Sequence, residues 1–431
     1  MTSTFQERIL IIFYNFSLEN MNSDFPVDVI PEIQSFLGGE DFTSSRFVSS
    51  SFTQSHQLLH SIVYYNSSKP LPKYITKVKL GPLVDDSVLE NASQLVYLGF
   101  NGNQNMTDKC LLNKPNLRNL GINRCLKITD NAFKQLKLTL LSAIFCTQLT
   151  DKTLSYLGSV KEFAISGNEK ITNNGLRWLI GIEFLLVDAC KQITDEGMYH
   201  LRNIKVLSIS GCTNVTDKGF NFLREIVGLN ASFTQITDGG LAGLIGIKNL
   251  LIDKCQGVTE AGLSKLKSLE TLSMSFCRNV NSDLFQYLPT LDHLNISNCK
   301  LIKEKDFAFL TNLKQLSMNN IQVSDNVFQF LSKVGTLNMN GCKFISDRGI
   351  RNLDNCTNLN ISDCNQVAIT DQAFRHLKLD TLIMKNCNQK TITPRLFDFI
   401  EGIRVLDIRG CTQFTRDDLI DFKAERLVMD E

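Results

Sequence analysis

The sequence has almost no excess of charge of either sign and no long hydrophobic run. Of its 431 residues, 45 are basic and 44 are acidic, spread along the chain. Nucleic acid is not an expected partner, because a phosphate backbone attracts a basic stripe that this sequence lacks. The longest apolar run near the start, Ile9 to Phe13, is too short to span a bilayer. We therefore expect no membrane partner and a location in the cytoplasm or nucleus.

The patterns of common catalytic and cofactor sites are also missing. There is no Gly-rich phosphate loop, and none of the five histidines recurs with a Cys or Ser and an acid in a nucleophile arrangement. His56 and His60 have the spacing of a zinc-protease helix, but the Glu of that motif and a third ligand are absent. We therefore expect a protein that is not an enzyme, with no catalytic residue, no cofactor and no metal.

What is present is a repeat. Most of the 13 cysteines fall in one frame whose positions lie 21 to 24 residues apart. Ahead of Cys212 lie Ile204, Leu207 and Ile209, and behind it comes Val215-Thr216-Asp217. The other positions of the frame repeat this pattern with similar residues. The frame is occupied by Asn103, Cys125, Cys146, Asn168, Cys190, Cys212, Thr234, Cys255, Cys277, Cys299, Ile321, Cys342, Cys364, Cys387 and Cys411.

This period and signature indicate leucine-rich repeats, in which each unit is a short strand followed by a helical segment. Leu207 and Ile209 alternate with Ser208 and Ser210, so the leucine and isoleucine are expected to face the core and the serines to face outward. Thr216 is expected to cap a helix whose positive end Asp217 favours. The fold class is thus predicted as an α/β leucine-rich-repeat solenoid of about 15 repeats, a curved parallel sheet with convex helices of about two turns.

The cysteines could in principle form disulfides, bind a metal or fill a structural position. Stacked strands lie about 4.8 Å apart with parallel Cβ vectors, which suits a ladder of thiols better than bridges. A metal would need a closed set of four ligands, whereas Asn, Thr and Ile replace Cys in this frame. We therefore predict small, reduced, inward-facing cysteines.

From about Leu95 to Phe422, these residues resemble the cysteine-containing leucine-rich-repeat family. The segment from Phe25 to Gln54 breaks the period and resembles an F-box, which implies docking on the Skp adaptor of an SCF ubiquitin ligase. Its Phe-Pro opening and Ser50-Ser51-Phe52 ending depart from the usual Leu-Pro and Lys-x-Trp, which implies a lower adaptor affinity. The alternative is a helical cap that only shields the first repeat. The resemblance places adaptor binding on Phe25, Pro26, Val29, Ile30, Ile33, Phe36, Leu37, Phe42, Val48 and Phe52.

The predicted organisation has four parts. Residues 1–22 are an N-terminal extension, 23–66 the F-box-like module, 67–94 a linker and degenerate first repeat, and 95–431 the repeats with a C-terminal cap. Within the third part, Ile75, Val78, Leu80 and Leu83 fit the repeat frame.

The resemblance implies the substrate-recognition subunit of an SCF-type E3 ubiquitin ligase, with Skp adaptor, cullin and a protein target as partners. The alternative is a leucine-rich-repeat interaction or inhibitory scaffold without ubiquitin function. Outward strand residues form a mostly polar track, beside which aromatic residues occupy a rim position often held by Gly. This mixture of anchors in a polar surround predicts a target site. It comprises Phe145, Phe184, Leu186, Asp188, Phe233, Asp253 and Phe276.

Overall fold

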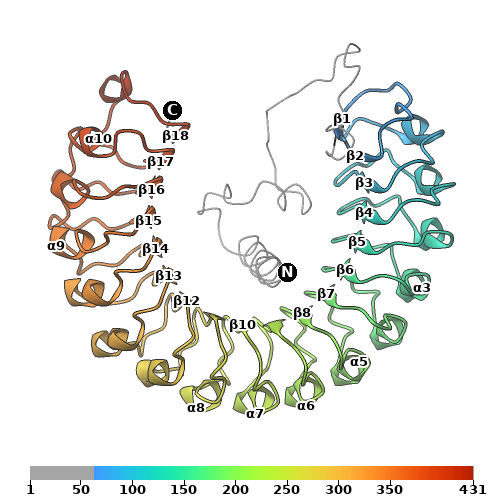
Figure 1. Ribbon diagram of the computed structural model, residues 1–431, viewed down its shortest axis with the longest axis horizontal. Coiled ribbons are helices and arrows are strands. Elements are labelled where there is room, and N and C mark those ends of the chain that lie inside the picture. Colours follow the sequence, from blue (N-terminus) through green and yellow to red (C-terminus); the bar gives the residue numbers. More distant parts are fainter. Residues whose placement is uncertain (1–62, 431) are drawn as a thin grey trace. The chain divides into compact units, whose positions relative to one another are not determined.

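The structure is a computed structural model that describes residues 63–430, and the chain divides after Thr234 into two compact units. The F-box-like segment and His56 and His60 therefore lie outside the described residues. In each unit, strands line one side and short helices line the other (Figure 1), and we call these the strand face and the helix face. Both units have the predicted leucine-rich-repeat fold.

The first unit contains a parallel sheet in which each strand pairs with the next along the chain. Its strands are β1 (Val63–Tyr65), β2 (Lys77–Leu80), β3 (Tyr97–Gly99), β4 (Asn119–Gly121), β5 (Leu140–Ser142), β6 (Glu162–Ala164), β7 (Phe184–Leu186), β8 (Val206–Ser208) and β9 (Gly228–Asn230). Its helices are η2 (Asp86–Leu89), η3 (Asp108–Leu111), η4 (Asp130–Phe133), α3 (Asp151–Ser155), α4 (Asn173–Leu176), α5 (Asp195–His200) and α6 (Asp217–Phe220).

The second unit repeats this arrangement, again with parallel pairing of consecutive strands. Its strands are β10 (Asn249–Leu251), β11 (Thr271–Ser273), β12 (His293–Asn295), β13 (Gln315–Ser317), β14 (Thr336–Asn338), β15 (Asn358–Asn360), β16 (Thr381–Ile383), β17 (Val405–Asp407) and β18 (Arg426–Val428). Its helices are α7 (Asp238–Leu241), α8 (Glu260–Leu263), η5 (Ser282–Tyr287), η6 (Glu304–Phe309), η7 (Asp325–Phe330), α9 (Asp347–Ile350), η8 (Asp371–Ala373), α10 (Leu396–Phe399) and η9 (Asp417–Leu419).

The middle residue of each strand forms a ladder in the core. Leu207 pairs in register with Leu185 on one side and Leu229 on the other, and all three are fully buried. Burying each leucine stabilises the stack by roughly 1.5–3 kcal/mol as an upper estimate. The strand register therefore follows from the hydrophobic period, as the sequence predicts.

The helices are shorter than the predicted two turns, with three to six residues each. A repeat of about 22 residues must also hold a strand and two connections, which leaves little room for a helix. The predicted cap is present: Thr216 is the N-cap of α6, and its hydroxyl accepts a hydrogen bond from the Lys218 amide at 3.4 Å.

The acid after the capping residue does more than favour the helix dipole. The Asp195 carboxylate accepts hydrogen bonds from the amide and the hydroxyl of Thr216 in the next repeat, both at 2.7 Å. Asp238 accepts the same two bonds from Thr259 in the second unit, at 2.8 and 2.6 Å. The recurrent acid thus ties each helix start to its neighbour, a role that helix capping alone does not predict.

The cysteines form the predicted ladder of thiols. All 13 are free and buried. The Cys212 thiol donates to the Val187 carbonyl of the preceding repeat at 3.2 Å, and Cys299 donates to Met274 at 3.0 Å. Where Asn168 replaces Cys, its amide donates to the carbonyls of Cys146 and Leu149 at 2.9 and 3.0 Å. The shared property of these side chains is therefore donation to backbone carbonyls of the repeat before.

The start of the repeats differs from the prediction at Leu83. Leu83 is exposed, and Val84 takes the buried position instead, because the turn after β2 places the next residue over the core. Residues 63–65, at the end of the predicted F-box-like module, form β1 and pair with β2. The domain boundaries themselves stay predictions.

Candidate functional site on the strand face

The strand face carries the side chains that the core does not use. They come from the first and third residue of each strand and from the position two residues further on, which is the predicted polar track. Most of these side chains bond one another or the next repeat. In the first unit, for example, the Asn123 side chain accepts hydrogen bonds from the Ser142 hydroxyl at 2.7 Å and the Ile144 amide at 2.9 Å.

Asp188 takes the equivalent role three repeats further on. Its carboxylate accepts from the Ser208 hydroxyl, from the Ser210 amide at 2.7 Å and from the Ser166 hydroxyl at 3.1 Å. Only 5% of Asp188 is exposed. Burial raises the pKa of its carboxyl from 3.8 to about 6, although these hydrogen bonds oppose the shift.

Asp253 repeats this arrangement in the second unit. It accepts from the Ser273 hydroxyl at 2.6 Å and the Ser275 amide at 2.7 Å, and burial raises its pKa to about 6. Both aspartates predicted to contact a target are therefore buried members of the sheet's own hydrogen-bond network. A direct ion pair with a target would require part of that network to open.

Three phenylalanines occupy the rim position directly before the Cys frame. Phe145, Phe233 and Phe276 have φ values of 56°, 59° and 58°, in the left-handed region where Gly167 and Gly211 also lie. A bulky side chain in this conformation costs on the order of 1–2 kcal/mol relative to Gly. Phe145 and Phe233 remain 42% and 40% exposed. Their rings are thus presented at the edge of the strand face at a conformational cost.

The rim rings also contact their neighbours. The Phe145 ring lies against Gly167, where a Cβ atom would collide with it, and the Arg124 guanidinium carbon lies 5.4 Å from its centroid. In the second unit, the Lys254 ammonium lies 5.2 Å from the Phe276 centroid. Each of these two rings therefore presents an exposed part beside a cation.

Phe184 and Leu186, the other predicted anchors, belong to β7 and are only 6% and 5% exposed. Leu186 packs with Ile144 and Ala164 in an apolar cluster on the strand face of the first unit. Both were expected as outward anchors, and both are buried.

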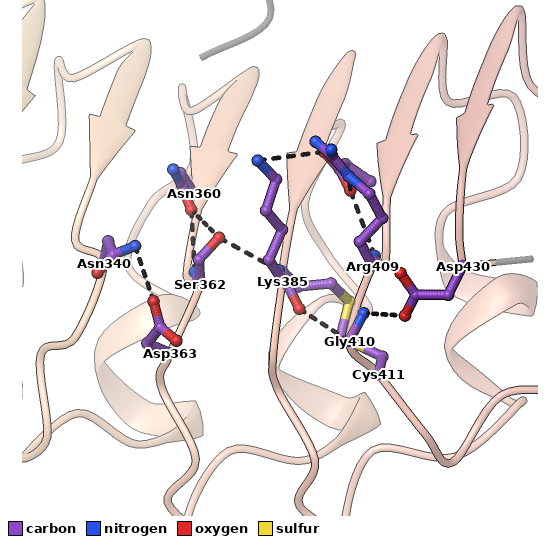
Figure 2. A network of polar contacts seen from close by, with 11 residues as sticks. Asn340, Asn360, Ser362, Asp363, Lys385, Arg409, Gly410, Cys411 and Asp430 are labelled. Atoms are coloured by element: carbon purple, nitrogen blue, oxygen red, sulfur yellow. Dashed lines mark hydrogen bonds and ion pairs between the residues drawn. The ribbon is translucent and has the colours of Figure 1, made fainter. Parts of the chain in front are cut away.

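A charged cluster that was not predicted lies near the end of the second unit. The Arg409 guanidinium makes a bidentate contact with the Asp407 carboxylate at 2.7 and 3.0 Å, and the Lys385 ammonium lies 3.6 Å from the same carboxylate. Figure 2 shows this cluster beside Asn360 and Ser362, whose side chains bond each other. Lys385 and Arg409 belong to the polar track, and Asp407 lies two residues before Arg409 on the same strand face, so the strand period alone could have paired Asp407 with Arg409.

The described residues contain no metal-binding cluster, and their thiols are buried. Residues 63–430 contain no group of three or more His, Cys, Asp or Glu side chains that could hold a metal ion. Burial raises the pKa of the Cys299 thiol to about 12, which keeps it protonated and unreactive at neutral pH. In the same part of the chain, no helix is long and apolar enough to cross a membrane.

The chain matches no protein-family model and no curated protein. Similar solved structures include the yeast Rad7–Elc1 complex, with 16% identity over 57% of this chain and 76% of that chain and a TM-score of 0.45. An internalin, InlF, from Listeria monocytogenes has 18% identity over 84% of this chain and 91% of that chain, with a TM-score of 0.44. The TLR13–ssRNA13 complex has 14% identity over 82% and 74%, with a TM-score of 0.42.

Proposed function

We propose that the chain is a non-catalytic, protein-binding leucine-rich-repeat subunit, specifically the substrate-recognition subunit of an SCF-type E3 ubiquitin ligase. The observation that carries the binding role is the strand face, where outward side chains, including strained and exposed rim phenylalanines, do not contribute to the leucine core. In this proposal the repeats hold the target protein and the N-terminal module holds the Skp adaptor, which connects to the cullin. The alternative remains an interaction or inhibitory scaffold without ubiquitin function.

The adaptor half of the proposal rests on the F-box resemblance of residues 23–66. Changing Ile33 and Leu37 together to Asp removes two residues of the docking face and should abolish binding to purified Skp adaptor. Far-UV circular dichroism of the full chain should stay unchanged, because the repeats fold around their own core. Adaptor binding that survives this double change would reject the assigned docking face, and a parent chain that does not bind the adaptor would favour the scaffold alternative.

The target half rests on Phe145 and Phe233 in the first unit and Phe276 in the second. A ring kept in the left-handed conformation, where Gly would be unstrained, favours a role outside the core. Each single change to Ala should weaken target capture by about 1 kcal/mol or more and leave adaptor binding intact. Asp188 and Asp253 are proposed to contribute by holding the serines of the strand face in place. Phe184 and Leu186 are proposed to form the apolar base of the target site.

The target can be found and its site tested in one experiment. A photo-crosslinking phenylalanine analogue at Phe233 should capture the same protein as one at Phe145, whereas one at Phe309 on the helix face should not. The captured protein is then purified and titrated against the three Ala variants. Crosslinks that arise only from Phe309, or Ala variants with undiminished affinity, would reject the strand-face site.

A further inference from the structure

The helix face of the first unit carries a row of aromatic side chains. Tyr156, Trp178, His200 and Phe222 follow one another at intervals of 22 residues, so they occupy the same position in four consecutive repeats. Trp178 and Phe222 are 44% and 40% exposed. A soluble protein seldom exposes neighbouring large rings without a function, because their apolar surface favours association.

Tyr199 joins this row from the adjacent helical position. It is 50% exposed, and its ring packs edge to face against Phe222 with centroids 5.5 Å apart and against His200 at 5.8 Å. The contact with Phe222 joins α5 to the turn that follows α6, the next helix along the chain (Figure 1). Tyr199, His200 and Phe222 therefore form a cluster of contacting rings, and together with Tyr156 and Trp178 we call them the aromatic row.

Arginines surround the row. The guanidinium carbon of Arg177 lies 5.0 Å from the Trp178 ring, and that of Arg202 lies 5.0 Å from the Tyr199 ring. A guanidinium that stacks on a ring by its face keeps N–H donors at its edge for a carboxylate. Arg224 follows Phe222 by two residues and adds a third cation to this side.

The nearby acids do not neutralise these arginines. Glu183 and Glu225 form salt bridges with Lys161 and Lys205, at 3.2 and 2.8 Å. Among residues 63–430, none of the three arginines forms an ion pair with an acidic side chain. The aromatic row therefore combines exposed rings with positive charge that has no intramolecular counterpart.

We propose that the aromatic row is a second protein-binding surface, and that its occupant is an acidic polypeptide segment with apolar side chains, supplied by a partner protein. The rings would take the apolar side chains, and Arg177, Arg202 and Arg224 would pair with its carboxylates. A nucleic acid fits less well, because the sequence lacks the basic stripe that a phosphate backbone attracts. This surface is separate from the strand face and does not depend on the proposed ligase role.

The single tryptophan makes the proposal directly testable, because Trp178 reports from inside the row. The full chain is titrated with an acidic amphipathic peptide of glutamate and leucine at helical spacing, while Trp178 fluorescence is followed. The same titration uses a peptide with lysine in place of each glutamate, and polyuridylate. We expect a saturable fluorescence change with the acidic peptide alone.

Two variants keep Trp178 and test the geometry. Phe222→Ala removes a ring and Arg202→Glu reverses a charge at an exposed position, and each should weaken binding of the acidic peptide about tenfold. Phe309→Ala is the matched control, since Phe309 holds the same repeat position in the second unit and is also exposed, and it should bind like the parent.

The results that would overturn the proposal are distinct. No saturable change with the acidic peptide, or equal binding of the lysine peptide, would show that the row is not a site for acidic segments. Tighter binding of polyuridylate would assign the surface to nucleic acid instead. Equal loss of binding in Phe309→Ala and Phe222→Ala would show that the fluorescence change does not come from contact with the row.

Discussion

Parts of the strand faces of the two units differ in chemistry although the cores beneath them are the same. In the first unit, β5 to β7 place Ile144, Ala164 and Leu186 in an apolar cluster on this face. In the second unit, β14 and β15 place Asn338 and Asn360 at the positions that Ala164 and Leu186 hold in their own strands. The middle residues of all these strands are large, apolar and buried in both units.

This difference shows that inward and outward residues are under different structural constraints. Inward residues must fill the space between repeats, so their type hardly varies. Outward residues need only satisfy their own polar groups or cover one another, so they can vary from leucine to asparagine without loss of the fold. The strand face is thus where the two units can acquire different binding properties.

The largest expected effect concerns what the units share. Cys212→Arg in the first unit and Cys299→Arg in the second should each lower the free energy of unfolding by about 4 kcal/mol or more, because each buries an unpaired charge in a filled position. Cys212→Asn should cost only about 1 kcal/mol, since Asn168 already bonds backbone carbonyls from this frame. Urea unfolding followed by circular dichroism measures all three. A severe effect in only one unit would break the claim of a common core.

The second prediction exchanges residues between the two faces. Leu186→Asn should destabilise by about 3 kcal/mol, from lost apolar burial and an amide without partners. Asn338→Leu should change stability by less than about 1 kcal/mol. It removes the hydrogen bond that the Asn340 amide donates to the Asn338 side chain, but the same amide still donates to the Asn319 side chain at 3.0 Å. Thermal unfolding of both variants gives the comparison. If the two changes cost the same, the apolar cluster of the first unit is not a distinct stabilising feature.

The difference between inward and outward residues also explains which parts of the fold and of the candidate site could be predicted from the sequence. The period, the strand register and the thiol ladder were predictable because inward residues such as Leu207 and Cys212 make the same contacts in every repeat, so their types recur at the repeat period. The burial of Leu186 and Asp188 was not, because it depends on small neighbours such as Ala164, Ser166 and Ser208 that lie about 20 residues away. Of the candidate site, the rim phenylalanines were predictable as exposed side chains, whereas the state of the strand residues beside them required the packed sheet.

The pH dependence of stability tests whether the buried carboxylate of each unit behaves in the same way. Because the pKa of Asp188 is raised from 3.8 to about 6 by burial, its contribution to stability is full below pH 3.8 and is lost as the pH rises through 6. Asp188→Asn should remove this loss and stabilise the chain at pH 8 by about 2 kcal/mol relative to the parent, with little difference at pH 4. Asn123, which fills the equivalent role, shows that an amide fits there.

Asp253→Asn should reproduce this pH profile in the second unit, since burial raises its pKa to about 6 as well. The measurement is urea unfolding of parent and variants between pH 4 and pH 8 (about 0.5-unit steps suffice for a shift of this size). Parent and variant curves that stay parallel across this range would mean that the carboxylates are already paired or hydrated in the folded state.

The smallest expected effect separates backbone strain from ring contacts at the rim. Phe233→Ala and Phe233→Gly both remove the ring, but only Gly relieves the left-handed conformation at φ 59°. The Gly variant should therefore be more stable than the Ala variant by about 1 kcal/mol. Phe276 in the second unit has φ 58° and should show the same difference between its two variants. Differential scanning calorimetry of the four proteins measures it. An Ala variant as stable as the Gly variant would mean that the rim is not strained, and the argument that these rings are kept for binding would then rest on their exposure alone.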